Sequence, residues 1–430
     1  MTLVKSLAHS PQSIFTKDFN LITLENGLTI VHHHLPYSTV VASNIWVNAG
    51  VITESEQESG ISHFLEHMIF KGTKNILPGQ FDYIVESKGG YTNACTSYDY
   101  THYSLTCASS YFYQTLPYLS EMILHAQIPD EHFELERDVV LEELRSTNDN
   151  HDWLIFQTLI NNIYQNHPYG RSVLGEEDLL RHHTPKSMRL YHQNLYHPEN
   201  MSFVVVGNIE KQEAIELAQK CFTDISLHSP TVSCVDFDSE APLVETRRQQ
   251  IYLPRLEQPR LVMGWMTSGA EDLEGAIALD MLSIVLSGGR SSRLIHKLRE
   301  EEQVVMDIGC DFSLQKYSSL FTITVYSYIN NLSEIEERLR LEIKLLREEL
   351  ISEKELKTCQ KSLYNDYIFS TETSEQLSSL YGYYQNLDQV DLAILYPQIL
   401  NSLTPEKLQQ YARQYLSMDY YAVCYAYPDR

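Results

Sequence analysis

Apolar positions in the first half of the chain follow two different periods. Short apolar runs bounded by turn residues predict strands, and apolar residues that recur every three or four positions predict amphipathic helices. The predicted strands are 20–31 (two runs around a turn at 25–27), 40–47, 91–94 and 98–108, and the predicted helices are 60–70, 80–88, 111–126 and 130–148. The mixture lacks strict strand–helix alternation, so it favours the α+β class, as a two-layer unit with a mostly antiparallel sheet.

Part of this pattern recurs in the second half. Thr184-Pro185 recurs 220 residues later as Thr404-Pro405, and the apolar strand 203–206 recurs as 423–426. Thr followed by Pro supplies an N-cap and a proline suited to the first helical turn, so each pair predicts a helix followed by a strand. We therefore expect a duplication of one α+β unit. The predicted division is a first half at 1–228, a linker at 229–248 and a homologous half at 249–430.

Two further patterns concern packing. Residues 334–355 carry apolar positions at helical spacing and are interpreted as one long amphipathic helix packed against a sheet. His32, His33 and His34 are consecutive. Because consecutive strand residues face opposite sides, we interpret them as solvated strand histidines and not as a metal cluster.

Composition narrows the classes of protein. The chain has 430 residues, 43% of them hydrophobic, and 57 acidic against 32 basic side chains give a net charge of −25. The length suits two domains of about 200 residues each, and no apolar run approaches the roughly 20 residues of a membrane-spanning helix. The acidity argues against nucleic acid as a partner and is compatible with basic peptides or simply with solubility.

The cysteines and the first residues bear on the compartment. Seven cysteines are widely scattered without a CxxC pair, and the first 20 residues lack the apolar core of a secretory signal. We expect reduced thiols in a cytoplasmic protein.

The segment 61–68, ISHFLEHM, carries the candidate chemistry. Residues four apart share one helix face, so His63 and His67 can present both imidazoles to one ion. Glu66 lies in the same arc, which gives the inverted His-x-x-Glu-His order of a zinc peptidase. Two imidazoles and a third protein ligand hold catalytic zinc, and a free carboxylate serves as general base. The alternative is a surface helix with solvated histidines.

Helix 130–148, for which Asp130 is the predicted N-cap, offers the third ligand. Glu136 and Glu143 are seven residues apart, hence nearly superposed, beside an apolar stripe. Carboxylates at the edge of a buried face need a positive partner, which zinc would supply; solvated surface acids are the alternative. Glu142 is a rival ligand, but it lies about 100° away around the helix.

Residues 60–73, GISHFLEHMIFKGT, resemble the metal signature of the pitrilysin/insulinase family of zinc metallopeptidases. The chain resembles most the branch of mitochondrial-processing-peptidase type, and segments 89–103, 167–175, 200–209 and 287–300 are also similar. In that family the third ligand is a glutamate about 76 residues beyond the second histidine, which is Glu143 here, and an accompanying glutamate matches Glu136.

The resemblance implies two homologous halves around a chamber that holds an unfolded peptide. It implies one zinc ion held by His63, His67 and Glu143, with Glu66 as the base. It also implies that the strand carrying Asn93 and Ala94 pairs with the substrate backbone. For Asn93, an ordinary polar residue at a strand end is the alternative.

The second half lacks these ligands. The repeat offset sets His63, Glu66 and His67 opposite Leu279, Leu282 and Ser283, or opposite Ser283, Leu286 and Ser287. Active single-chain members of the family carry an arginine followed seven residues later by a tyrosine, and both contact the substrate. Here Arg299 is kept and Met306 replaces the tyrosine. Methionine donates no hydrogen bond, so support for the tetrahedral intermediate would be missing.

Three interpretations of this departure stay open. The preferred one is the zinc-bearing subunit of a heterodimer whose relative supplies the Arg/Tyr pair. A second is a self-sufficient peptidase, alone or as a homodimer. A third, of another class, is a non-catalytic core or scaffold subunit of an assembly, which an eroded metal motif would mark; the motif here is intact.

Overall fold

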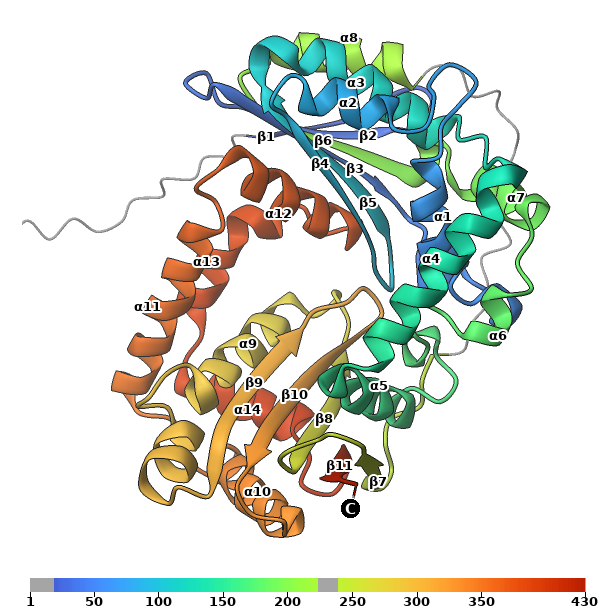
Figure 1. Cartoon of the computed structure of the whole chain (residues 1–430). Helices are drawn as coiled ribbons and strands as arrows, with labels where there is room; N and C mark the ends of the chain where they lie inside the picture. The colour runs from blue at the N-terminus through green and yellow to red at the C-terminus, as the bar shows by residue number, and fades with distance from the viewer. Residues whose placement is uncertain (1–18, 223–238, 430) are drawn as a thin grey trace, which may run out of the picture.

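The computed structural model describes residues 19–222 and 239–429, which form two sheets (Figure 1). The six-stranded sheet has the order β1-β2-β6-β3-β5-β4, and the five-stranded sheet has the order β7-β11-β8-β10-β9. Within them only β2–β6 and β7–β11 are parallel pairs. The expected α+β class with mostly antiparallel sheets is confirmed. The strands are β1 (Phe19–Thr23), β2 (Thr29–His34), β3 (Val40–Val47), β4 (Tyr91–Thr96), β5 (Thr101–Ala108), β6 (Met201–Gly207), β7 (Arg247–Leu253), β8 (Arg260–Ser268), β9 (Val305–Ser313), β10 (Ser318–Ser327) and β11 (Ala422–Pro428).

The two sheets share one topology once β1 is set aside. Strands β2, β6, β3, β5 and β4 take the same places as β7, β11, β8, β10 and β9, including the parallel pair. Thr184 and Thr404 cap the helices that precede β6 and β11, as the repeat predicts. The halves are therefore built alike. The boundaries stay a prediction, since residues 229–238 of the expected linker lie outside the described residues and β7 begins at Arg247.

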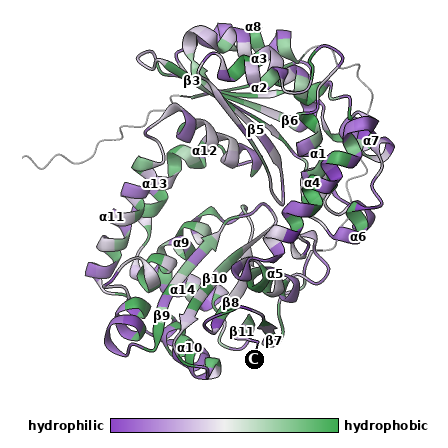
Figure 2. Cartoon of the chain, in the orientation of Figure 1, coloured by the Kyte–Doolittle hydropathy of each residue, from purple (hydrophilic) through white to green (hydrophobic). Residues whose placement is uncertain are grey.

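Helices line both sheets. In Figure 1, α2, α3 and α8 cover the outer face of the first sheet, and α9, α10 and α14 pack on the second. Figure 2 shows α9 as mainly hydrophobic, whereas hydrophilic residues recur along α4. The helices are α1 (Ile61–Ile69), α2 (Gln80–Glu86), α3 (Ser109–Leu124), α4 (Asp130–Asn148), α5 (His151–Ile163), α6 (Glu177–Leu180), α7 (Pro185–Leu195), α8 (Lys211–Cys221), α9 (Leu273–Ser287), α10 (Leu332–Glu348), α11 (Glu353–Phe369), α12 (Ser374–Asn386), α13 (Leu392–Ser402) and α14 (Pro405–Tyr415), with a π-helical turn at Ile295–Glu301.

One helix of each half packs on the sheet of the other half. Helix α12 packs on β3 and β6 of the first sheet, and α5 packs on β7, β8 and β11 of the second (Figure 1). Strand β6 shows the result, because Phe203 and Val205 face the core of the first half while Val204 and Val206 join the core that α12 belongs to. Both faces of the central strand are thus buried, which explains its unbroken apolar run.

Two glycines allow these helices to come close. A Cβ on Gly382 of α12 would lie 1.9 Å from Nε1 of Trp46 on β3. A Cβ on Gly264 of β8 would lie 2.8 Å from Cδ1 of Ile163 on α5. The indole of Trp46 cannot move aside easily, since its ring packs against those of Tyr100 and His102 at 4.5 and 4.6 Å.

Three local expectations were wrong. Residues 334–355 form two helices, because the Ser352 side chain accepts the Glu355 N–H and the Glu355 carboxylate accepts the Ser352 N–H, a capping box that starts α11. Pro129, not Asp130, is the N-cap of α4. His32 is buried and its Nε2 bonds to the Ile209 carbonyl, so it is not solvated.

Among the residues that the structure describes, no helix combines the length and the apolar character needed to cross a bilayer.

Substituting Gly382 by alanine tests the exchanged helix. The new methyl group collides with the fixed indole, and we expect the free energy of unfolding to fall by about 1–3 kcal/mol in urea titrations. Gly309→Ala is the matched control, because the nearest atom to its Cβ is 4.0 Å away, and its effect should stay within about 0.5 kcal/mol. Equal stabilities of the two variants would contradict this packing.

Candidate metal centre

Helix α1 is held at its start by a buried carboxylate. Gly60, the N-cap, has φ of +83° and offers no side chain for capping. The Glu54 carboxylate accepts the N–H groups of Gly60 and Ser62 at 3.0 and 2.9 Å, and Glu54 is fully buried. A negative group at a helix N-terminus is favourable, so Glu54 fixes the helix that carries both histidines. Sequence reasoning missed Glu54, which has no periodic or motif signal.

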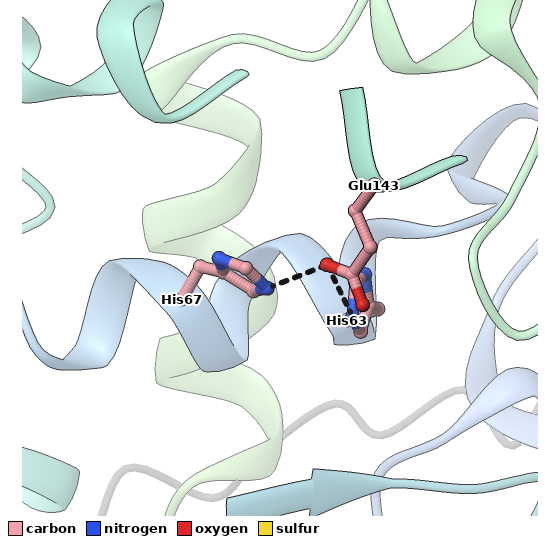
Figure 3. A group of neighbouring side chains, drawn as sticks. All are labelled: His63, His67 and Glu143. Carbon is pink, nitrogen blue, oxygen red and sulfur yellow. Dashed lines mark ion pairs between the residues drawn. The ribbon is translucent and has the colours of Figure 1, made fainter. Parts of the chain in front are cut away.

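The three predicted ligands meet in space (Figure 3). His63 and His67 project from α1, and Glu143 reaches them from α4. Oε2 of Glu143 lies 3.6 Å from Nε2 of His63 and 3.3 Å from Nε2 of His67. Two donors bound at about 2.1 Å to one tetrahedral zinc ion would be about 3.4 Å apart. The separations and the donor types therefore fit a zinc ion.

The surroundings shift the pKa values of the two histidines in opposite directions. Burial lowers the pKa of His63 to about 3, so its imidazole is neutral, as a ligand must be. Burial also acts to lower the pKa of His67, but the hydrogen bond to Glu136 and nearby carboxylates outweigh it and raise that pKa. Nδ1 of His67 faces Oε1 of Glu136 at 3.0 Å, which leaves Nε2 toward Glu143.

Glu136 is itself anchored. Its Oε2 lies 2.6 Å from the ammonium of Lys71. Burial would raise the pKa of Glu136, but the hydrogen bonds from His67 and Lys71 lower it overall, so the carboxylate is charged. Lys71 was missed in the sequence; it lies just beyond α1, which ends at Ile69, so helical spacing alone does not set it beside Glu136.

Glu66 lies beside the cluster without joining it. Burial raises the pKa of its carboxyl group, and the hydroxyl of Thr96 donates a hydrogen bond to its Oε2 at 2.5 Å. Thr96 is the last residue of β4. It shares a strand face with Ala94, which packs toward the core that contains α1, so the period of two could have found it.

Its position excludes Glu142 as the third ligand, and the corresponding positions of the second half hold no metal ligands. The side chain of Glu142 is 76% exposed and pairs with Arg145, while Glu143 is 44% exposed and faces the histidines. Leu279, Leu282 and Ser283 are buried in α9. Among the described residues, His63, His67 and Glu143 form the one group with metal-ligand geometry.

Of the three predicted substrate-contact residues, Asn93 and Ala94 lie on a sheet edge and Arg299 does not. Asn93 and Ala94 are in β4, the last strand of the first sheet. Met306 is in β9, the last strand of the second, and is 37% exposed. Arg299 lies in the π-helical turn, and the ion pairs found for it among the described residues join it to Glu300 and Asp307, not to the metal cluster.

Known proteins resemble the chain over most of its length. A family model described as insulinase (peptidase family M16) matches residues 29–177, and one described as peptidase M16 inactive domain matches residues 182–363. An uncharacterized zinc protease of Bacillus subtilis, YmxG, is 28% identical over 93% of this chain and 96% of its own. The β subunit of the mitochondrial-processing peptidase of Neurospora crassa is 29% identical over 51% of this chain and 46% of its own. The crystal structure of a protease from Helicobacter pylori superposes with a TM-score of 0.87 at 25% identity, covering 95% of this chain and 99% of the other.

Neighbouring glutamates provide a paired test of the third ligand. Glu143→Gln removes one charged donor from the cluster, so we expect zinc affinity to fall by more than about a hundredfold in chelator competition. Glu142→Gln changes the adjacent, exposed residue and should leave zinc affinity unchanged. The assignment fails if Glu142→Gln gives the larger loss.

Proposed function

Because the chain belongs to the insulinase family of peptidases, M16, we propose that it is a zinc-dependent endopeptidase subunit that cuts peptides or presequence-like segments bound in extended form. The single observation that carries the proposal is the cluster of His63, His67 and Glu143 with the uncoordinated carboxylate of Glu66 beside it. The names of the relatives, zinc protease and processing peptidase, support the same class of reaction.

Each residue of the site then has a distinct task. His63, His67 and Glu143 would hold the ion, and zinc, when bound, supplies Lewis-acid chemistry that activates water and polarises the peptide carbonyl. Glu66 accepts the proton of the attacking water and delivers it to the leaving amine. The hydrogen bond from Thr96 fixes the orientation of its carboxylate. Glu136 holds the His67 ring through Nδ1.

Strand β4 is the proposed substrate-binding edge. It pairs with β5 on one side, so its other side can accept an extended peptide as an added strand, with Asn93 and Ala94 next to the site. The net charge of −25 favours peptides with basic residues among the substrates. The cysteines found in the described residues are unpaired, which supports a reducing compartment, the cytoplasm.

A homologous partner subunit is the preferred way to complete the site. Met306 offers no hydrogen-bond donor, and the guanidinium of Arg299 is already paired with Glu300 and Asp307. A relative that carries the Arg/Tyr pair would supply both groups, as the likeness to a processing-peptidase β subunit suggests. A self-sufficient homodimer is the second candidate. A non-catalytic scaffold role is disfavoured by the intact cluster.

Glu66→Gln separates metal binding from chemistry. The amide is nearly isosteric but cannot accept the proton, so hydrolysis of a quenched-fluorescent peptide should fall by about 10²–10⁴-fold or more. Zinc content should stay at one ion per chain by elemental analysis. Full activity in this variant would refute Glu66 as the base, and lost zinc would make it a ligand.

Met306→Tyr tests the missing donor. If the methionine limits the isolated chain, the new hydroxyl should raise kcat/KM by about a hundredfold, the effect of one such donor. Met306→Phe adds the ring without the hydroxyl and should change nothing. Strong activity of the unmodified chain alone would contradict the need for a partner, and equal activity of the two variants would contradict the missing hydroxyl as the limiting group.

A further inference from the structure

The turns of two equivalent hairpins meet between the halves. The β4–β5 turn of the first sheet and the β9–β10 turn of the second occupy corresponding places in the shared topology. Asp99 lies in the first turn, and its Oδ2 accepts the backbone N–H of Lys316 in the second turn at 3.3 Å. Asp99 is only 7% exposed, so this contact joins the halves in a buried setting.

Tyr169 completes the connection. Its hydroxyl donates to Oδ1 of Asp99 at 2.6 Å and accepts the backbone N–H of Tyr317 at 3.3 Å. The ring is fully buried, and that of Tyr98 packs on it at 5.4 Å. Asp99 thus receives two donors from outside its own hairpin, although burial raises its pKa. A buried carboxylate keeps its place only when such donors satisfy it.

The same hairpin leads directly to the catalytic base. Thr96, three residues before Asp99, donates to Glu66 and lies 3.3 Å from the hydroxyl of Thr101 at the start of β5. The turn between them is pinned further by the Ile52 N–H, which donates to the Tyr98 carbonyl at 2.9 Å. A displaced turn would therefore displace Thr96 as well.

The contacts of Asp99 matter because β4 lies at the edge of its sheet. Strand β4 pairs with one neighbour only, and an edge strand opens more readily than a central one. Helix α1 holds Glu66 from one side, but the β4 end of the Thr96–Glu66 bond needs its own support. The second half supplies that support through the N–H groups of Lys316 and Tyr317.

We propose that Asp99 is a positioning residue, which ties β4 to the second half through Lys316 and Tyr169. It thereby preserves the hydrogen bond from Thr96 to Glu66 and holds β4, the substrate-binding edge, in register. The inference rests on the proposed peptidase function. It gives the half without metal ligands a task in the same chain: it sets the position of the strand that orients the base.

Asp99→Asn is the main test, in the zinc-loaded protein. The amide replaces one acceptor with a donor, so either Tyr169 or the Lys316 N–H loses its partner. We expect kcat/KM for a fluorogenic peptide to fall by about a hundredfold through misplacement of reacting groups. Amide hydrogen exchange in residues 91–96 should accelerate, while zinc affinity and exchange in α4 stay at wild-type values, because both metal-bearing helices lie outside the hairpin.

Asp388→Asn is the matched control. Asp388 pairs with the ammonium of Lys316 at 2.9 Å, is largely exposed, and has φ of +58°, which asparagine tolerates well. It disturbs the same lysine without touching the Asp99 contacts, so activity and exchange should match the wild type. A loss equal to that of Asp99→Asn would overturn the proposal.

Other results of these experiments would also decide whether Asp99 positions β4. Wild-type kcat/KM in Asp99→Asn, or lost activity with unchanged exchange in β4, overturns the proposal. If Asp99→Asn does not fold, Tyr169→Phe removes one donor and keeps the acid; unchanged β4 exchange there also overturns it. If the wild-type chain cuts no peptide with zinc, either alone or with a homologous partner subunit, the proposed function fails, while the exchange difference in β4 still decides whether Asp99 anchors the strand.

Discussion

The reciprocal exchange of α5 and α12 is the constraint on which the rest of the molecule depends. Each sheet has an apolar face that the helix from the other half covers, so neither sheet can bury both faces with its own residues. The exchange also fixes the position of the two halves relative to each other. Gly382 against Trp46 leaves no room for another spacing, because the packed interior does not adjust to an extra methyl group without strain. The contact between the two hairpins follows from that fixed placement.

The candidate metal centre gathers charged side chains more closely than they would lie if each were exposed to water. Glu66 and Glu143 approach two histidines, with Glu136 behind them. Lys71 balances Glu136, and Thr96 satisfies Glu66. A divalent cation would balance Glu143, the most exposed of the three. The arrangement thus explains why a strongly acidic chain tolerates this concentration of acid at one place.

Duplication followed by divergence of roles accounts for the asymmetry between the halves. The topology is kept, but α9, which stands where the repeat offset places the metal motif, carries leucine and serine and serves as buried core. The second half, which lacks these metal ligands, has two structural roles. It covers the first sheet with α12, and it holds the turn that contains Asp99.

The sequence by itself determined what depends on local periodicity: the six strands and five of the helices of the first half, the α+β class, the duplication, and the helix spacings that set His63 beside His67 and Glu143 apart from Glu142. It did not predict α5, α6 or α8. Local capping was only partly readable, as residues 334–355 show. Tertiary structure alone decided the exchange of helices, the burial of His32, and the partners Glu54 and Asp99. These depend on contacts between segments far apart in the chain, and no residue spacing records which distant groups packing will bring together.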